Sequence, residues 1–114
     1  MAKLTTHILD TSSGKPANGV KINLYRKKDQ NSVLIKTAET NSDGRCNEAL
    51  LSGQDFIVGC YELEFSVDQY FKANKVDCPF LRDVVVRFYI TEEDENYHVP
   101  LLISPFSYST YRGS

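Results

Sequence analysis

The sequence contains no tryptophan, one methionine and three cysteines in 114 residues. The cysteines, Cys46, Cys60 and Cys78, are odd in number and widely spaced, which fits neither a zinc site nor a disulfide framework. We expect them to be thiols in a reducing compartment, and therefore predict a cytoplasmic protein. The two histidines are too few for a typical three-ligand catalytic zinc site unless a carboxylate joins them.

Membrane, secretion and nucleic-acid signals are also missing. No apolar run approaches the length of a membrane span, and no signal-peptide pattern precedes Lys3. A net charge of −2 gives no electrostatic reason to expect a nucleic-acid partner. Glycine-rich phosphate loops and the G-x-S-x-G motif are absent, and the acidic stretch 91–96 lacks the spacing of a calcium loop.

What the chain does have is the composition of a globular domain. Hydrophobic residues make up 41% and charged residues 25% of it. A chain of this length buries roughly two thirds of its unfolded surface, which is enough for one core. No internal repeat or linker divides the sequence, so we predict a single domain over residues 1–114.

Alternation of apolar and polar residues dominates the chain and is typical of half-buried strands. One short helix is expected at 69–75, with Asp68 as its N-cap, and a turn at 41–44 uses Gly44 for a positive φ. Such a pattern predicts an all-β sandwich of seven or eight strands. The expected strands cover 3–10, 20–26, 32–40, 60–67, 84–90, 97–103 and 106–111.

Strand parity also predicts an unusual outer face. If the odd-numbered residues of 97–103 face the core, the even-numbered residues of this strand point outward. If the strand at 3–10 belongs to the same sheet, His7 and Leu9 lie on the same outer face. A solvated face should carry charges like those of Glu62 and Glu64, so this one indicates association or ligand binding. The outward residues would be His7, Leu9, His98, Pro100, Leu102, Ser107, Ser109 and Tyr111.

Several motifs occur in a familiar order: THILD at 6–10, GKPANGV at 14–20, SDGR at 42–45 and a long stretch at 97–114. Together they resemble the transthyretin-like 5-hydroxyisourate hydrolases of purine catabolism, over essentially the whole chain. The terminal YRGS is the most specific part, because SPFSYST before it would indicate only the wider transthyretin superfamily. FLRDV at 80–84 departs from the FFPEV that the family often has, which affects a connecting loop.

The resemblance implies a transthyretin-like sandwich of seven or eight strands with one short helix. It also implies a homotetramer, built as a dimer of dimers, whose active sites lie in a channel at the dimer–dimer interface. The family reaction is hydrolysis of 5-hydroxyisourate to 2-oxo-4-hydroxy-4-carboxy-5-ureidoimidazoline, and neither a metal nor an organic cofactor is implied.

Residue by residue, the resemblance also implies a site. Its catalytic residues are His7, Arg45, His98 and Ser114. Its substrate-binding residues are His7, Arg45, Tyr111, Arg112 and Gly113. A neutral imidazole can accept a proton from water and an imidazolium can return it, while an arginine can stabilise a developing oxyanion. Which histidine is the base stays open, as does whether the terminal serine acts through its hydroxyl or its carboxylate.

Two other functions remain possible on a fold of this kind. One is a non-enzymatic, transthyretin-type module that binds or transports a small ligand, and the other is a structural sandwich whose outer face only joins subunits. Two histidines and an arginine at these positions favour the enzyme, because a hydrophobic carrier channel would not be expected to keep them.

Overall fold

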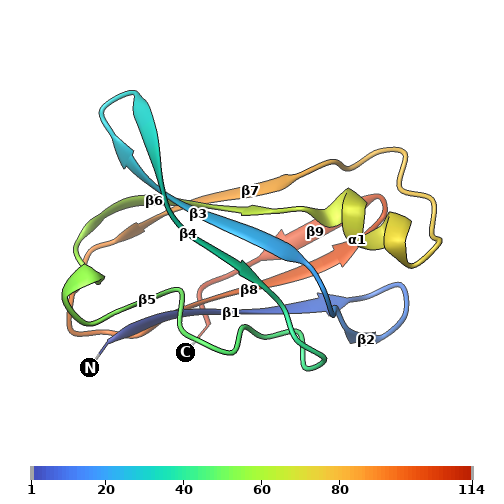
Figure 1. Cartoon of the computed structure of the whole chain (residues 1–114), viewed down its shortest axis with the longest axis horizontal. Helices are drawn as coiled ribbons and strands as arrows, with labels where there is room; N and C mark the ends of the chain where they lie inside the picture. Colours follow the sequence, from blue (N-terminus) through green and yellow to red (C-terminus); the bar gives the residue numbers. More distant parts are fainter. Residues whose placement is uncertain (1, 114) are drawn as a thin grey trace.

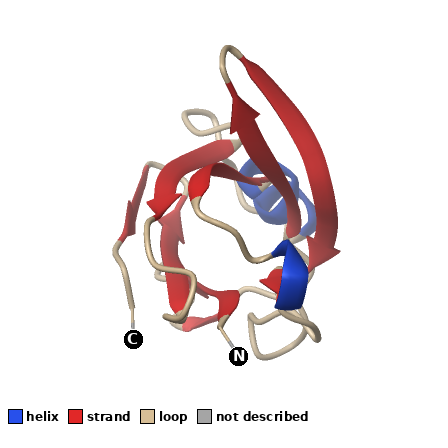
Figure 2. Ribbon diagram, turned by 90° about the vertical axis from the view of Figure 1, so that its left-hand side faces the viewer, coloured by secondary structure: helices blue, strands red, loops and turns tan. Residues whose placement is uncertain are grey.

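The computed structural model describes residues 2–113 as two β-sheets packed face to face, with one α-helix at one end (Figure 1). Seen nearly end-on, the sheets curve around a shared interior, and the β3–β4 hairpin projects beyond it (Figure 2). The predicted all-β sandwich with a short helix is confirmed. Its elements are β1 (Lys3–Asp10), β2 (Lys15–Pro16), β3 (Lys21–Lys28), β4 (Asn31–Glu39), β5 (Leu51–Ser52), the 3₁₀ turn η1 (Gly53–Asp55), β6 (Gly59–Phe65), α1 (Val67–Ala73), β7 (Val84–Ile90), β8 (Tyr97–Ser104) and β9 (Ser107–Thr110).

The first sheet has the order β2-β1-β8-β9, and the short strand β5 pairs with the start of β1. Strands β1 and β8 are parallel, with Thr5 opposite His98 and His7 opposite Pro100. Because paired residues point to the same side of a sheet, all four side chains lie on one face. This pairing joins segments from opposite ends of the sequence and builds the predicted outer face.

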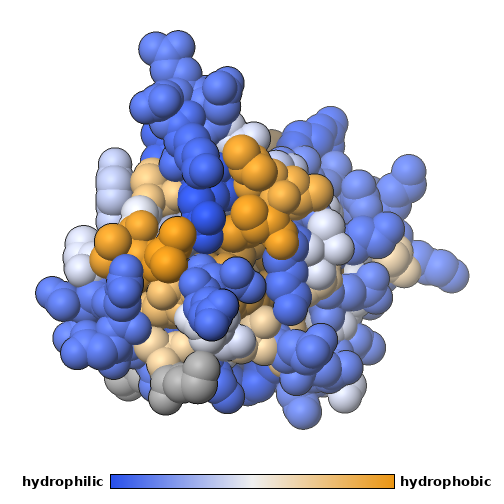
Figure 3. All heavy atoms as spheres, turned by 60° about the vertical axis from the view of Figure 1, so that its left-hand side comes forward, coloured by the Kyte–Doolittle hydropathy of each residue, from blue (hydrophilic) through white to orange (hydrophobic). Residues whose placement is uncertain are grey.

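The second sheet is antiparallel throughout, in the order β4-β3-β6-β7. Its outer face is charged, since Glu64 accepts a hydrogen bond from Asn23 and Glu62 forms an ion pair with Arg87 at 2.8 Å. Apolar side chains also reach the surface at the end of the molecule below the projecting hairpin (Figure 3). The outer face of the second sheet is therefore mixed, since Val85 and Tyr89 of β7 are exposed on it beside the glutamates.

The core lies between the sheets and follows the predicted alternation. The large side chains with less than 2% of their surface exposed come from both sheets and from the helix. Each such apolar side chain contributes roughly 1.5–3 kcal/mol to folding. The inward residues of β8 are Tyr97, Val99, Leu101 and Ile103, all buried as predicted.

The helix begins earlier than the sequence pattern predicts. Val67 is its first residue and is fully buried, and Ser66 is the N-cap. The prediction that Asp68 caps the helix is wrong, because burial of Val67 draws the chain into the helix before this carboxylate, which accepts a hydrogen bond from the amide of Gln69 instead. The hydroxyl of Tyr70 donates to Asp10 at 2.8 Å and fixes the helix to β1.

Pro100 shapes the end of the chain. It has the predicted outward parity, but it is buried. Proline has no amide to donate, and regular pairing of β8 with β9 ends at Leu101 and Thr110, next to it. The Thr110 hydroxyl donates to the Pro100 carbonyl at 2.7 Å. The chain then rejoins β8 in unchanged register, with Gly113 opposite His98.

Candidate active site

Four segments meet on the outer face of the first sheet: β1, β8, the turn that ends at Arg45, and the tail after β9. His7 and His98 come from adjacent strands and are diagonal neighbours on this face. Arg45 is bridged to His7, and Gly113 is bridged to His98. The structure thus brings together four of the residues that the sequence predicts.

His98 is held on two sides. Its Nδ1 lies 2.8 Å from Oγ1 of Thr5, and its carbonyl accepts a hydrogen bond from the amide of Gly113 at 2.7 Å. Burial lowers the pKa of His98 below its ordinary 6.5, and the positive charge of Arg45 and the proximity of His7 lower it further. The imidazole is therefore neutral at neutral pH and can accept a proton.

Arg45 reaches this face because of the turn before it. Gly44 has a φ of +74°, and a Cβ there would lie 2.5 Å from the carbonyl oxygen of Ile8, so the turn packs directly on β1. The side-chain oxygen of Asn41 accepts hydrogen bonds from the amides of Asp43 at 2.9 Å and Arg45 at 3.2 Å. The predicted turn is confirmed, and it fixes the backbone of an exposed arginine.

Two cavities open beside these residues. The larger has a volume of about 310 Å³ and is lined by Lys3, Thr5, Arg45, Asn96 and His98. The smaller, about 120 Å³, shares Thr5 and Arg45 and also touches Cys46. Sequence reasoning missed the three additional polar residues of the larger cavity. Strand parity could have found two of them, because residues 3 and 5 share the outward parity of His7.

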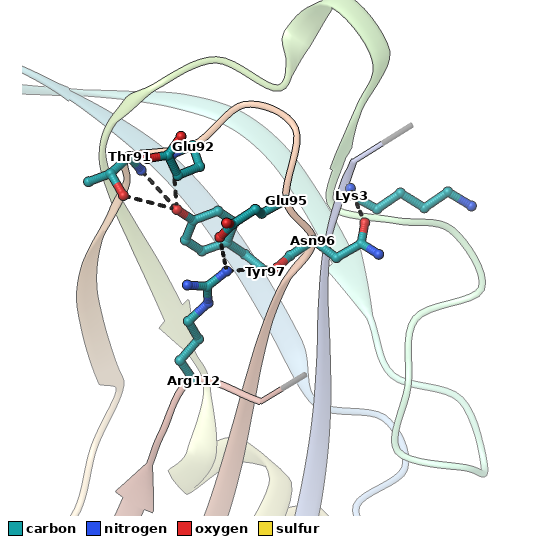
Figure 4. A network of polar contacts seen from close by, with 7 residues as sticks. All are labelled: Lys3, Thr91, Glu92, Glu95, Asn96, Tyr97 and Arg112. Carbon is teal, nitrogen blue, oxygen red and sulfur yellow. Dashed lines mark hydrogen bonds and ion pairs between the residues drawn. The ribbon is translucent and has the colours of Figure 1, made fainter.

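The side chain of Arg112 lies elsewhere. Its guanidinium donates to Glu95 at 3.0 Å and to the carbonyl of Asn96 at 3.1 Å, and its central carbon lies 4.1 Å from the centre of the Tyr97 ring (Figure 4). The Tyr97 hydroxyl in turn accepts hydrogen bonds from two amides, those of Thr91 and Glu92 (Figure 4). Arg112 therefore fastens the tail to the β7–β8 loop.

Tyr111 is 61% exposed and lines a groove of about 250 Å³ between β7 and the tail, separate from the cavity beside His98. Ser114, the fourth predicted catalytic residue, lies outside the described residues. Tyr111 and Arg112 are thus not gathered with the histidines in this one chain, whereas Gly113 is.

The described residues were also compared with the requirements of a metal site and of a membrane-spanning helix. Within residues 2–113, no three side chains of histidine, cysteine, aspartate or glutamate lie close enough together to hold a metal ion. Over the same range, no helix has the length and apolar character needed to cross a bilayer. The three cysteines are free thiols.

Comparison with known proteins covers nearly the whole chain. A family model described as HIUase/Transthyretin family matches residues 4–113. The 5-hydroxyisourate hydrolase of Pseudomonas aeruginosa is 53% identical over 117 aligned residues, which cover 100% of this chain and 93% of that protein.

Solved structures share the fold. Klebsiella pneumoniae 5-hydroxyisourate hydrolase matches at a TM-score of 0.84 and 35% identity, covering 100% of both chains. An (S)-allantoin synthase matches at 0.93 and 42% identity, over 99% of this chain, which spans only 44% of the synthase. Sea bream transthyretin in complex with thyroxine matches at 0.91 and 32% identity, over 98% of this chain and 95% of the transthyretin.

Proposed function

The chain belongs to the HIUase/Transthyretin family, and from this membership we propose that it hydrolyses 5-hydroxyisourate to 2-oxo-4-hydroxy-4-carboxy-5-ureidoimidazoline. The family prediction is confirmed, and the predicted hydrolase activity is that of its full-length relatives at about 50% identity. The observation that carries the proposal within this chain is the meeting of two histidines and an arginine on one face: His7, Arg45 and His98.

The reaction opens a ring by adding water to a cyclic amide. A carbon–oxygen bond forms as a neutral imidazole takes a proton from the attacking water. The carbon–nitrogen bond then breaks, and an imidazolium returns the proton to the leaving nitrogen. The carboxylic acid that remains releases its own proton to water and becomes a carboxylate. The guanidinium of Arg45 can stabilise the negative charge that develops on the carbonyl oxygen. We propose that His7 and His98 position and activate the attacking water.

Roles for the tail follow from where its residues lie. Gly113 has no side chain and lets the backbone contact His98, and Arg112 holds this backbone in place through Glu95 and Tyr97. Tyr111 has the outward parity to contact a substrate or another subunit. The catalytic role of Ser114 stays a prediction, because this residue lies outside the described range.

We also propose that the protein is a homotetramer, a dimer of dimers with its sites at the dimer–dimer interface. Support comes from the outer face of the first sheet, which carries Leu9, Leu102 and both histidines where the second sheet carries glutamates. Closed symmetric assemblies are the usual form of such association. Light scattering should give the mass of four chains, and a monomer would contradict this proposal.

The activity has a direct spectroscopic test. Urate oxidase generates 5-hydroxyisourate from urate, and its ultraviolet absorbance is followed with and without the purified protein. We expect decay well above the buffer rate. Deleting residues 111–114 should abolish the acceleration while the sandwich still folds, as judged by circular dichroism. Decay at the buffer rate with the intact protein would refute the hydrolase proposal.

A second candidate function is non-enzymatic binding or transport of a small ligand. The similarity to a transthyretin solved with thyroxine favours it. Calorimetry distinguishes the two, because a carrier binds its ligand without producing heat of turnover or product. A hydrolase should instead consume 5-hydroxyisourate at catalytic concentrations of protein.

A cytoplasmic location is proposed on the basis of the three free thiols, since disulfides are rare in reducing compartments. Cell fractionation should recover the protein with cytoplasmic markers.

A further inference from the structure

Thr5 makes a direct contact with one of the proposed catalytic histidines. It lies opposite His98 in the parallel ladder of β1 and β8, and both side chains are half-buried on the outer face. The Thr5 hydroxyl oxygen lies 2.8 Å from Nδ1 of His98, a normal hydrogen-bond distance. The two residues are 93 positions apart, so the contact depends on the tertiary fold rather than on local sequence.

The surroundings of the ring leave one nitrogen available. Thr5 occupies Nδ1, and the backbone of Gly113 packs against the other edge, since a Cβ at that position would lie 2.8 Å from Cδ2 and 3.4 Å from Cγ. Within the described residues, Nε2 is therefore the ring nitrogen left for a reactant in the cavity.

The charges around the cavity indicate which way the hydrogen bond runs. A hydroxyl can donate a hydrogen bond to Nδ1 or accept one from it. If it accepts, the proton of the neutral ring is on Nδ1 and Nε2 carries the lone pair. Lys3 and Arg45 line the cavity together with His98, and His7 lies diagonally across the face. Arg45 is the permanent cation whose charge acts on this imidazole, and a lone pair close to a positive charge is favourable, whereas an N–H group there is not. The arrangement favours a proton on Nδ1.

We propose that Thr5 is a positioning residue whose hydroxyl accepts the Nδ1–H of neutral His98, so that Nε2 is the proton acceptor of the reaction. The inference rests on the proposed hydrolase function and makes His98 the general base. The proton of the attacking water moves to Nε2 as the water oxygen bonds to the carbonyl carbon. The imidazolium keeps its hydrogen bond from Nδ1–H to Thr5. The Nε2 proton is later transferred to the leaving nitrogen of the substrate.

The tautomer can be measured without substrate. Nitrogen-15 NMR of the intact protein should show His98 protonated on Nδ1 and unprotonated on Nε2 at neutral pH. Thr5→Val removes the hydroxyl at nearly constant shape and should move the ring toward the Nε2–H form, while Thr5→Ser should retain the wild-type tautomer. Thr11→Val is the matched control, because the Thr11 hydroxyl also bonds to β8, at the carbonyl of Ile103, but away from the site. An Nε2–H tautomer in the wild-type protein would overturn the proposal.

Kinetics provide the second arm. General base catalysis contributes roughly 10²–10⁴-fold, so we expect Thr5→Val to lower kcat by about tenfold or more with little change in KM. Thr5→Ser should restore most of the rate, and Thr11→Val should behave like the wild type. Unchanged kcat in Thr5→Val would refute the positioning role. If the wild-type protein does not hydrolyse 5-hydroxyisourate, the proposed function fails, while the NMR result still decides where the His98 proton lies.

Discussion

The amide of Gly113 donates to the carbonyl of His98 at 2.7 Å, and a Cβ at position 113 would lie 2.8 Å from Cδ2 of the same histidine. The tail thus lies so close to this ring that position 113 has no room for a side chain, and the proposed reaction needs the ring in place. Since Gly113 does not have a positive φ, the requirement for glycine comes from this contact and not from backbone strain.

Gly113→Ala should therefore damage the site more than the fold. The methyl group must displace either the imidazole or the tail, and a misplacement near 1 Å can cost about a hundredfold in rate. We expect kcat to fall by about tenfold to a hundredfold, measured by 5-hydroxyisourate decay, with an unchanged melting temperature. A fully active variant would show that the contact is not needed for catalysis.

The pH dependence should reflect the lowered pKa of His98. The pKa of His98 in the folded protein lies below the ordinary 6.5, so the unfolded chain binds this proton more tightly. The stability contributed by neutral His98 is therefore lost as the pH falls below about 6.5. The acid limb of kcat/KM should likewise lie below pH 6.5. Arg45→Gln should raise the His98 pKa, because it removes a positive charge, and NMR titration of the ring protons measures both values. A His98 midpoint above 6.5 in the wild type would contradict this reading.

Removing the side chain of Arg112 should release the tail. Arg112→Gln loses the Glu95 ion pair, in which both side chains are about half exposed, so the stability cost should be small, about 0–1 kcal/mol. Activity should fall much further than stability, because Gly113 loses its anchor. Arg87→Gln is the control for loss of an arginine ion pair of similar length, here with the more buried Glu62 on the other sheet. Equal activity in the two variants would argue against an anchoring role.

The turn before Arg45 offers a paired test of packing. Gly44→Ala combines a left-handed φ with a contact of 2.5 Å to Ile8, while Gly14→Ala has a similar φ of +75° and no neighbour within 4 Å. The φ alone should cost each variant about 1–2 kcal/mol in the free energy of unfolding. Urea denaturation should show a larger loss for Gly44→Ala, and only this variant should lose activity through displacement of Arg45. Equal losses would show that the turn can move off β1.

Much of the fold follows from the sequence because alternation reports which side of a strand is buried. Alternation alone predicts Tyr97 and Val99 inside and His98 outside, and it predicts His7 on the same outer face. Residue parity predicts burial here because one face of each strand contacts the core. A shift of a strand by one residue would move its apolar side chains from the core to the solvent.

Parity does not report which strands are neighbours. The parallel register of β1 with β8, the bond from Thr5 to His98, and the packing of Gly113 on the ring all arise from pairing between distant segments. The contacts of Arg112 with Glu95 and Tyr97 likewise join the tail to a separate loop, which parity does not report. The helix start was missed because burial of the residue at its beginning outweighed the local capping preference.

The parallel pairing of β1 with β8 has a consequence for biosynthesis. Thr5 leaves the ribosome 93 residues before His98, which at 5–20 residues per second is an interval on the order of 5–20 seconds. During that time β1 can pair only with β2, β5 and the turn at Gly44 and Arg45, and it lacks its long parallel ladder with β8. We expect β1 to be the segment of the nascent chain that most depends on chaperones.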